Sequence, residues 1–309
     1  MKVNKKKRAG ATTLLLILVF LAGLSLLLYP TVSNWWNSRY HAQAIDDYTQ
    51  VVSDMKNETY EELWASARAF NEELYDRGGY NLDDDLLEQY KSLLNVSGAG
   101  VMGYIEIPSI NSTLPIYHGT DESVLQVALG HLEWTSLPVG GESTHSVVSG
   151  HRGLPSAELL THIDRLEQGD KFYIHVLNET LEYRVCDIFV VLPEDTSKLQ
   201  IVEGKDYMTL VTCTPYGVNS HRLLVRGERV HSDRVSETGQ LYLNNEIKEI
   251  HLMYVIPVVM VAVVLMTGLA IWIQEKRAAY QKKRRQERRM RRRAQQRRED
   301  AWSNDSENG

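Results

Sequence analysis

The sequence has 309 residues, 24% of them charged, and a formal net charge of -6; this length suits one large domain or two small ones. Its charges are unevenly distributed, because residues 1–10 and 274–309 hold 18 of the 34 basic residues and six of the 40 acidic ones. The middle therefore has 16 basic and 34 acidic residues. Such an acidic middle argues against nucleic-acid binding by that part of the chain.

Two uncharged apolar stretches predict membrane-spanning helices. Residues 11–29 and 252–273 are 19 and 22 residues long, and each can cross about 30 Å of hydrocarbon as a helix. Basic residues precede the first stretch in 1–10 and follow the second in 274–309. By the positive-inside rule both ends are cytoplasmic. We therefore expect a two-pass protein of the cell membrane with an extracellular middle.

The first stretch has an alternative interpretation as a cleaved signal peptide. Its 19 apolar residues exceed the usual signal core, and the residues just after it, 30–36, contain no Ala-x-Ala site. Trp35 and Trp36 suit the aromatic belt at a membrane surface. These features favour a retained anchor. The basic tail 274–309 would lie just inside the second span, and this position favours anionic lipid over nucleic acid as its partner.

Residues 30–98 read as helical and acidic. Apolar residues recur at spacings of three and four in 40–55 and 60–75, and a shorter helix is expected at 83–94. Glycines and Asn81 interrupt the pattern between the last two helices. The region is either a stalk that lifts the next domain off the membrane or a lid over a functional site, and the sequence leaves both possibilities open.

From 99 to 231 the pattern changes to short apolar runs separated by turn residues about every ten positions. The expected strands cover 102–107, 109–116, 146–150, 171–176, 182–192, 208–213 and 222–230, with short helices or turns at 122–129 and 158–166. This spacing predicts a mainly β domain, a barrel or a sandwich. The polar residues 232–251 are expected to be a linker to the second span.

The strand ending at Cys213 and the strand starting at Arg222 are separated by a turn rich in proline, glycine and asparagine. If the two strands pair as a hairpin, the thiol lies beside the guanidinium. A fixed positive charge favours the thiolate, which is the nucleophilic form of cysteine. Cys213 and Arg222 are therefore candidate catalytic residues.

A nucleophilic cysteine also needs a proton donor and acceptor, and His151 is the best candidate among ten histidines. It ends a predicted strand, and glycines flank the pair that it forms with Arg152, which permits a sharp turn and a close approach. The remaining candidates have weaker positions: His145 lies six residues earlier, His221 is expected on the opposite face from Arg222, and His118, His131 and His162 lie in turn or helix regions.

The second cysteine, Cys186, sits in a strand-like run and is expected to be a small buried side chain rather than a nucleophile. A disulfide with Cys213 is possible in an extracellular domain, but two cysteines are few for a domain held by disulfides. The sequence has no zinc, calcium or phosphate-loop motif. We expect neither a metal nor a cofactor.

Several phrases together resemble the sortase family. They are Thr209-Leu-Val-Thr-Cys213, Pro215-Tyr-Gly217 followed by Arg222, Gly103-Tyr-Ile-Glu-Ile-Pro108, Leu114-Pro-Ile-Tyr-His-Gly119 and Gly150-His-Arg-Gly-Leu-Pro155. His151 falls where the family has its histidine, 62 residues before the cysteine. With a second span after the predicted barrel, the layout resembles the class C, pilus-assembling sortases.

The resemblance implies an eight-stranded β-barrel and a cysteine transpeptidase of Gram-positive bacteria. Such an enzyme cuts a Leu-Pro-x-Thr-Gly sorting signal between Thr and Gly through a thioester on Cys213. His151 would exchange protons with the leaving and incoming amines, and Arg222 would hold the substrate or the oxyanion. Its partners would be pilins or surface proteins with C-terminal sorting signals. The acceptor would be a pilin lysine or, alternatively, an amine of a cell-wall peptide.

One feature departs from the family pattern. Class C sortases usually carry a lid with an Asp-Pro-aromatic motif before the barrel, and no such tripeptide occurs in 30–98. Residues 76–85 lie roughly where the motif should be, and Tyr80 or Trp64 could plug the site instead. A third hypothesis, a membrane scaffold without catalysis, requires the Cys213, His151 and Arg222 combination to be a coincidence.

Overall fold

The computed structural model describes residues 5–79 and 82–230, with the backbone alone for 5–16, and scattered helical residues between 263 and 290. The chain divides into two units, Met1–Ser236 and Glu237–Gly309. The strands that the structure describes belong to the first unit. The predicted linker 232–251 falls outside the described residues, as does most of the predicted second span 252–273.

Three helices precede the barrel: α1 (Lys5–Ser53), α2 (Asn57–Asp76) and α3 (Asp84–Ser92). The helices predicted from the apolar spacing are confirmed, although the first is the end of a much longer helix. Asp83 caps α3, because its carboxylate accepts a hydrogen bond of 2.9 Å from the amide of Leu86. In the described part of the chain, the stretch Ile17–Ser53 of α1 is the single helix long and apolar enough to cross a membrane.

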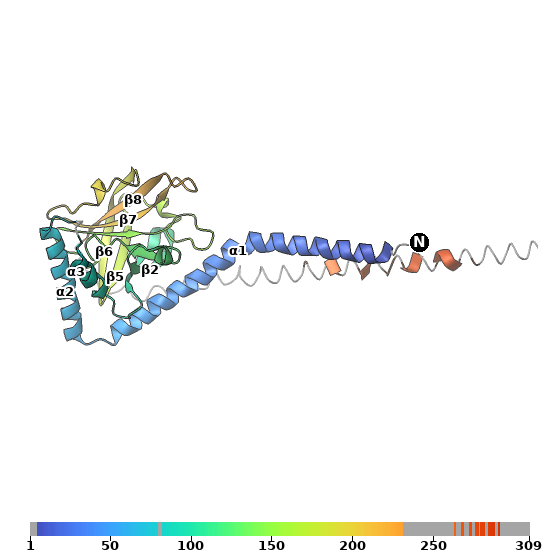
Figure 1. The fold of residues 1–309 in the computed structure, drawn as a ribbon, viewed down its shortest axis with the longest axis horizontal. Coiled ribbons are helices and arrows are strands. Elements are labelled where there is room, and N and C mark those ends of the chain that lie inside the picture. Colours follow the sequence, from blue (N-terminus) through green and yellow to red (C-terminus); the bar gives the residue numbers. More distant parts are fainter. Residues whose placement is uncertain are drawn as a thin grey trace, which may run out of the picture. The chain divides into compact units, whose positions relative to one another are not determined.

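The rest of the first unit, after these three helices, is a closed eight-stranded barrel with short helices, as the resemblance implied (Figure 1). Its strands are β1 (Val101–Ile107), β2 (Ser112–His118), β3 (Leu129–His131), β4 (Thr144–Ser149), β5 (Lys171–Val176), β6 (Glu179–Val191), β7 (Asp206–Thr214) and β8 (His221–Arg229). Their order around the barrel is β1-β2-β3-β4-β7-β8-β6-β5. The pairs β2/β3 and β4/β7 are parallel, and the other pairs are antiparallel.

Two sequence-based assignments were wrong in detail. The predicted strand 109–116 starts with the short helix η1 (Pro108–Ile110), because Asn111 adopts a left-handed conformation (φ 50°) that ends it before β2. The segment 122–129, predicted as a helix or turn, is α4 (Glu122–Leu125) followed by a turn, and β3 already begins at Leu129. The short helices η2 (Ile163–Arg165) and η3 (Ser197–Leu199) complete the fold.

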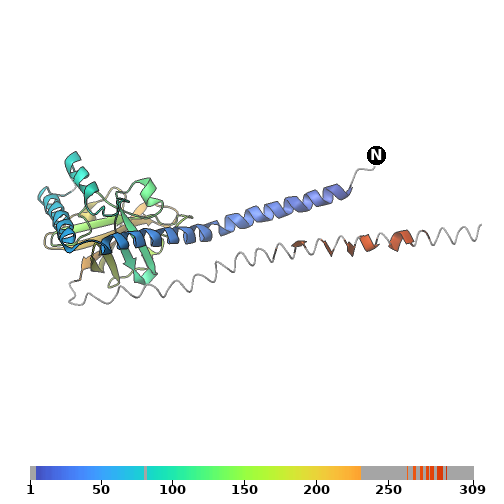
Figure 2. The same ribbon diagram turned by 90° about the horizontal axis from the view of Figure 1, so that it is seen from below.

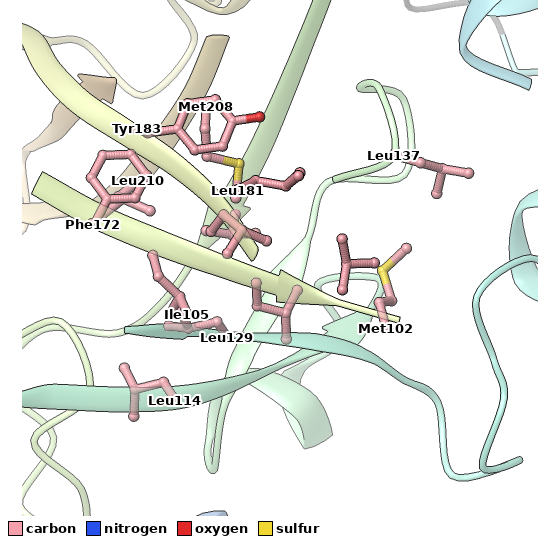
Figure 3. Close-up of a cluster of buried hydrophobic side chains, with 14 of the residues drawn as sticks. Met102, Ile105, Leu114, Leu129, Leu137, Phe172, Leu181, Tyr183, Met208 and Leu210 are labelled. Carbon is pink, nitrogen blue, oxygen red and sulfur yellow. The ribbon is translucent and has the colours of Figure 1, made fainter. Parts of the chain in front are cut away.

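The barrel is filled by large apolar side chains that alternate along the strands (Figure 3). Met102, Ile105, Leu129, Phe172 and Leu210 have no exposed surface. Fully burying side chains of this size stabilises the fold by about 1.5–3 kcal/mol each. The interior is therefore a packed core, and any substrate must bind on the outside or at an end of the barrel.

The two ends of the barrel are distinguished by the hairpin turns at opposite ends of β6. Its first residues adjoin the β5–β6 turn at Asn178, whereas Val191 pairs with Arg222 next to the β7–β8 turn. Helices α2 and α3 cover the β5–β6 end (Figure 1). The indole of Trp64 donates to the Asn178 side chain at 3.0 Å, and the amide of Asn71 bonds both the N–H and the C=O of Leu137.

Helix α1 runs along the barrel and reaches the loops at the other end (Figure 2). The side-chain amide of Asn37 donates to the carbonyl of Ser156 at 2.7 Å, and Asn34 accepts from the amide of Glu158 at 2.9 Å. The ring of His41 contacts the carbonyl of Val127. These contacts join α1 to the loop that follows His151 and to the segment between α4 and β3.

Candidate active site

The predicted hairpin is confirmed. β7 and β8 are antiparallel, and Cys213 lies directly opposite Arg222. The turn between them is closed by hydrogen bonds from the amides of Val218 and Asn219 to the carbonyl of Pro215. Opposed residues in an antiparallel pair have Cβ atoms about 4.5–5.5 Å apart. The thiol and the start of the arginine side chain are therefore neighbours across the sheet.

His151 reaches the same place from β4, which is the parallel neighbour of β7 on its other side. Ser149 pairs with Val211, and the amide of Gly150 donates to the carbonyl of Val211 at 3.1 Å. The hydroxyl of Thr212 then donates to the carbonyl of Gly150 at 2.7 Å. One further residue along each segment places His151 next to Cys213. Three strand ends thus bring the three predicted residues together.

The glycines around His151 permit a sharp turn and a close approach, as the sequence suggested. The groups that lie against them are side chains of the protein itself. A Cβ at Gly150 would lie 2.4 Å from a methyl carbon of Leu129. Gly153 has a φ of +82°, and a Cβ there would lie 2.8 Å from the ring of Tyr216. Both positions therefore require glycine, since the loop packs closely against β3 and the β7–β8 turn.

The imidazole of His151 is only partly covered, with 30% of its side chain exposed. Its Nε2 atom has no hydrogen-bond partner among the described residues. The nearest carboxylate is that of Glu122 in α4, with Oε1 at 4.0 Å from Nε2, too long for a hydrogen bond. Nε2 itself is buried, and within the described part of the chain no hydrogen bond locks the ring in place.

His131 and His145 are structural. Both have no exposed surface, and burial lowers the pKa of His131 to about 3 and that of His145 to about 4, so both rings are neutral at pH 7. His145 is held by the carbonyl of Gln200 and the hydroxyl of Thr209. The ring of His118 contacts two backbone carbonyls. These contacts remove His118, His131 and His145 as candidates for proton transfer, whereas His151 lies where the β4–β7 register leads to Cys213.

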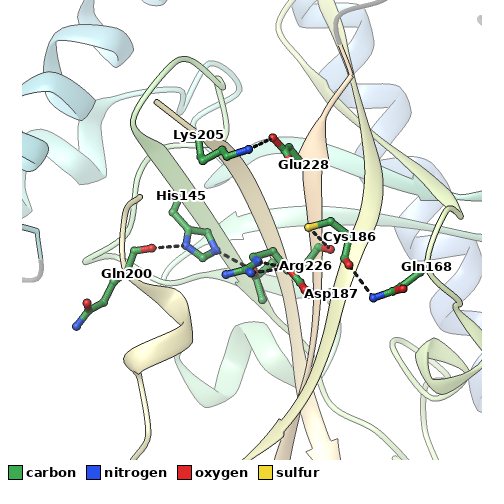
Figure 4. A network of polar contacts seen from close by, with 9 residues as sticks. His145, Gln168, Cys186, Asp187, Gln200, Lys205, Arg226 and Glu228 are labelled. Atoms are coloured by element: carbon green, nitrogen blue, oxygen red, sulfur yellow. Dashed lines mark hydrogen bonds and ion pairs between the residues drawn. The ribbon is translucent and has the colours of Figure 1, made fainter. Parts of the chain in front are cut away.

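The two cysteines are free, and their surroundings differ. The thiol of Cys186 donates to the carbonyl of Arg226 at 3.3 Å and is part of the polar network in Figure 4. Burial, together with the neighbouring Asp187, raises the pKa of Cys186. It is therefore a protonated and poorly reactive thiol, as the sequence predicted. Cys213 is the better candidate nucleophile.

Two of the three arginines of β8, Arg226 and Arg222, differ in the same way. Arg226 is engaged on every side: it pairs with Asp187 and lies over the ring of Tyr207 at 4.5 Å. Arg222 donates only to the backbone carbonyls of Asn219 and His221, at 3.3 and 3.2 Å, and has no carboxylate partner among the described residues. Its charge is thus free to meet an anionic group of a ligand.

Two features of the site were not found from the sequence. One is Glu122, whose approach to His151 depends on the position of α4. The other is Arg152, whose side chain crosses from the His151 loop to the β7–β8 turn. A regular repeat could not reveal either contact, because Arg152 lies in an irregular loop and Glu122 begins a helix of only four residues. Among the described residues no cluster of three or more His, Cys, Asp or Glu side chains could hold a metal ion.

Comparison with known proteins agrees with this geometry. A sortase domain model matches residues 105–230. The crystal structure of sortase C1 from Streptococcus agalactiae is 50% identical, with a TM-score of 0.60 over 62% of this chain and 100% of that chain. The chain belongs to the sortase family. The matched region contains Cys213, His151 and Arg222.

Other solved sortases point to the same class, so the resemblance to class C sortases is confirmed. Sortase C of Streptococcus pneumoniae, described in terms of its pilin substrate specificity, is 43% identical over 62% of this chain and 97% of that chain, with a TM-score of 0.54. Clostridium perfringens sortase C, solved with a C-terminal cell wall sorting motif, is 44% identical over 62% and 100%, with a TM-score of 0.54. The chain spans 63% and 60% of the first curated sortases it matches.

Proposed function

We propose that this sortase is a membrane-anchored cysteine transpeptidase that cleaves a Leu-Pro-x-Thr-Gly type of sorting signal between Thr and Gly. The observation that carries the proposal is the convergence of Cys213, His151 and Arg222 from the ends of β7, β4 and β8. A thiol, an imidazole without a structural bond at Nε2 and an unpaired guanidinium are the groups that acyl transfer requires.

In the first half-reaction the thiol of Cys213 gives its proton to His151, the sulfur attacks the threonine carbonyl carbon, and the carbonyl oxygen becomes an oxyanion. Arg222 donates hydrogen bonds to this oxygen or to the adjacent substrate carbonyls. The C–N bond then breaks, and His151 gives a proton to the departing glycine nitrogen. The products are a free amino-terminal glycine peptide and a thioester on Cys213.

In the second half-reaction an amine attacks the thioester carbon while His151 accepts the proton that the amine loses. The C–S bond breaks, and Cys213 is regenerated with a new amide bond in the product. We infer that the amine is a lysine of a pilin subunit, because several solved structures that resemble this chain are class C sortases. A cell-wall peptide amine is the alternative acceptor.

The membrane arrangement is part of the proposal. The helix Ile17–Ser53 is a candidate anchor, and we infer that residues 11–29 span the membrane with 1–10 in the cytoplasm. Residues 252–273 would form a second span, with the barrel of 99–231 outside and the basic tail 274–309 inside. Protease digestion of intact cells should leave both ends protected. Cleavage of the tail from outside would refute the two-pass arrangement.

The reaction is tested with the full chain in detergent and a quenched fluorescent peptide that contains Leu-Pro-x-Thr-Gly. Cys213→Ala should abolish both peptide cleavage and covalent capture of the peptide. Cys186→Ala is the matched control, because it removes the other thiol and should keep both activities. Retained cleavage in Cys213→Ala would refute the assignment. Adding a candidate pilin should give covalent ladders, whereas transfer only to a cell-wall peptide would favour the alternative acceptor.

A further inference from the structure

Arg152 is a nearly buried cation in the loop that follows β4. Its side chain is 9% exposed, and Nη2 donates to the carboxylate of Asp164 at 2.6 Å. Nε donates to the carbonyl of Thr161 at 3.2 Å, and Nη1 donates to the hydroxyl of Thr214 at 3.3 Å. Three nitrogens of one planar group therefore address three different acceptors, a geometry that the guanidinium fork permits and an ammonium does not.

The place of these contacts in the chain gives them a functional meaning. Arg152 directly follows His151, and Thr214 directly follows Cys213. On the other side of the pair, the residue before Cys213 bonds the residue before His151, through the hydroxyl of Thr212 and the carbonyl of Gly150. The thiol and the imidazole are thus enclosed between two cross-strand hydrogen bonds, one before them and one after them.

Both bonds use a side chain, so neither belongs to the regular sheet ladder. β4 ends at Ser149, and Gly150 still donates its amide to Val211 of β7, so the loop from His151 onward lies beyond the ladder. The guanidinium of Arg152 and the packing of Gly153 against the ring of Tyr216 hold this loop on the β7–β8 turn. The ring of Tyr216 also lies 6.0 Å from the centre of the guanidinium.

We propose that Arg152 is a positioning residue for the transpeptidase reaction: it holds the His151 loop against the end of β7 and so sets the distance between the imidazole and the thiol. Asp164 neutralises its charge and fixes the direction of the fork. Arg152 is therefore distinct from Arg222, whose cation has no carboxylate partner among the described residues. This inference rests on the proposed function, since it concerns proton transfer between His151 and the reacting groups.

The test measures kcat and KM of peptide cleavage by the full chain for Arg152→Lys and Arg152→Gln. A displacement of about 1 Å in an active site can reduce the rate about 100-fold, so we expect kcat to fall about 10- to 100-fold in both variants with little change in KM. Lysine should not rescue the rate, because it cannot reach three acceptors. Arg165→Gln is the matched control, as an exposed arginine in the same loop, and should behave as wild type.

A second pair of variants covers the case in which Arg152→Gln does not fold. Thr214→Val removes only the hydroxyl that accepts from Arg152. We expect kcat to fall about threefold to tenfold, which corresponds to the loss of one hydrogen bond. Thr214→Ser keeps the hydroxyl and should keep the wild-type kcat. In a folded double variant, Arg152→Gln with Thr214→Val should be no slower than Arg152→Gln alone, because both remove one contact.

Normal kcat in Arg152→Lys or Thr214→Val would overturn the proposal. A change confined to KM would also overturn it, since Arg152 would then bind substrate. A rate loss that matches the fraction of unfolded protein, measured by thermal denaturation, would reduce Arg152 to a structural role. Failure of the proposed function is distinguishable, because wild-type protein would then cleave no sorting peptide.

Discussion

The apolar face of α2 decides whether the helices before the barrel are structural or a lid. Phe70 has no exposed surface and packs in the same core as the barrel strands, with its ring 6.3 Å from that of Tyr90 in α3. Phe70→Ala would leave a cavity, and such changes cost about 3–5 kcal/mol of unfolding free energy. For a unit of this size the melting temperature should fall by about 6–20 °C.

The assay is thermal denaturation of the full chain in detergent, combined with peptide cleavage at a temperature where the variant remains folded. Cleavage per folded molecule should be unchanged, because the described contacts of α2 lie at the barrel end away from Cys213. Tyr75→Ala is the matched control on the same helix. Its side chain is 38% exposed, so the unfolding free energy should change by less than about 1 kcal/mol.

Two results would refute this reasoning. A melting temperature within about 2 °C of wild type for Phe70→Ala would show that α2 is not part of the core. A several-fold rise in cleavage by the folded variant would show that the helices cover the site. Trp64, one of the two plugs suggested by the sequence, is 6% exposed and bonded to Asn178, so it is not beside Cys213. The other, Tyr80, lies outside the described residues.

Two further predictions concern charge. Arg222→Lys should lower kcat/KM of peptide cleavage about 100-fold, because lysine lacks the planar fork; near-normal turnover would make Arg222 structural. Acid should destabilise the fold between pH 6.5 and 4, because the unfolded chain protonates His145 below its ordinary pKa of 6.5 whereas the folded chain resists protonation down to about pH 4. Over this pH range, protonation linked to His145 lowers the unfolding free energy by on the order of 3 kcal/mol. The unfolding free energy of His145→Gln, measured with denaturant, should depend less on pH than that of the wild type. An equal pH dependence in the two proteins would contradict the burial argument.

The regular part of the fold could be predicted because its signal is local. β5 is found at its predicted bounds, and the other long strands differ from prediction by one to three residues at their ends. β3 escaped detection because three residues contain too few alternations to define a period. Its identity depends on pairing with β2 and β4, and no local pattern of Leu129–His131 encodes that pairing.

The site was partly predictable for the same reason. The position of Cys213 opposite Arg222 follows from two strands and a short turn, which are adjacent in sequence. The position of His151 beside them depends on the parallel register of β4 and β7, which the motif resemblance indicated and spacing alone did not. The roles of Arg152 and Glu122 depend on loop paths, and these follow from tertiary packing rather than from residue order.

The same loops connect the site to the anchor. In α1, Asn37 donates to the carbonyl of Ser156, and Asn34 accepts from the amide of Glu158. Both partners lie in the loop that follows His151. Eight helical residues separate Asn37 from the end of the predicted span at Tyr29, a distance of about 12 Å along the axis. The reactive end of the barrel is therefore held near the point where α1 would leave the membrane. A substrate that is itself retained by an apolar segment would present its cleavage site at a similar height. If residues 11–29 span the membrane as we propose, the geometry of α1 suits a membrane-held substrate.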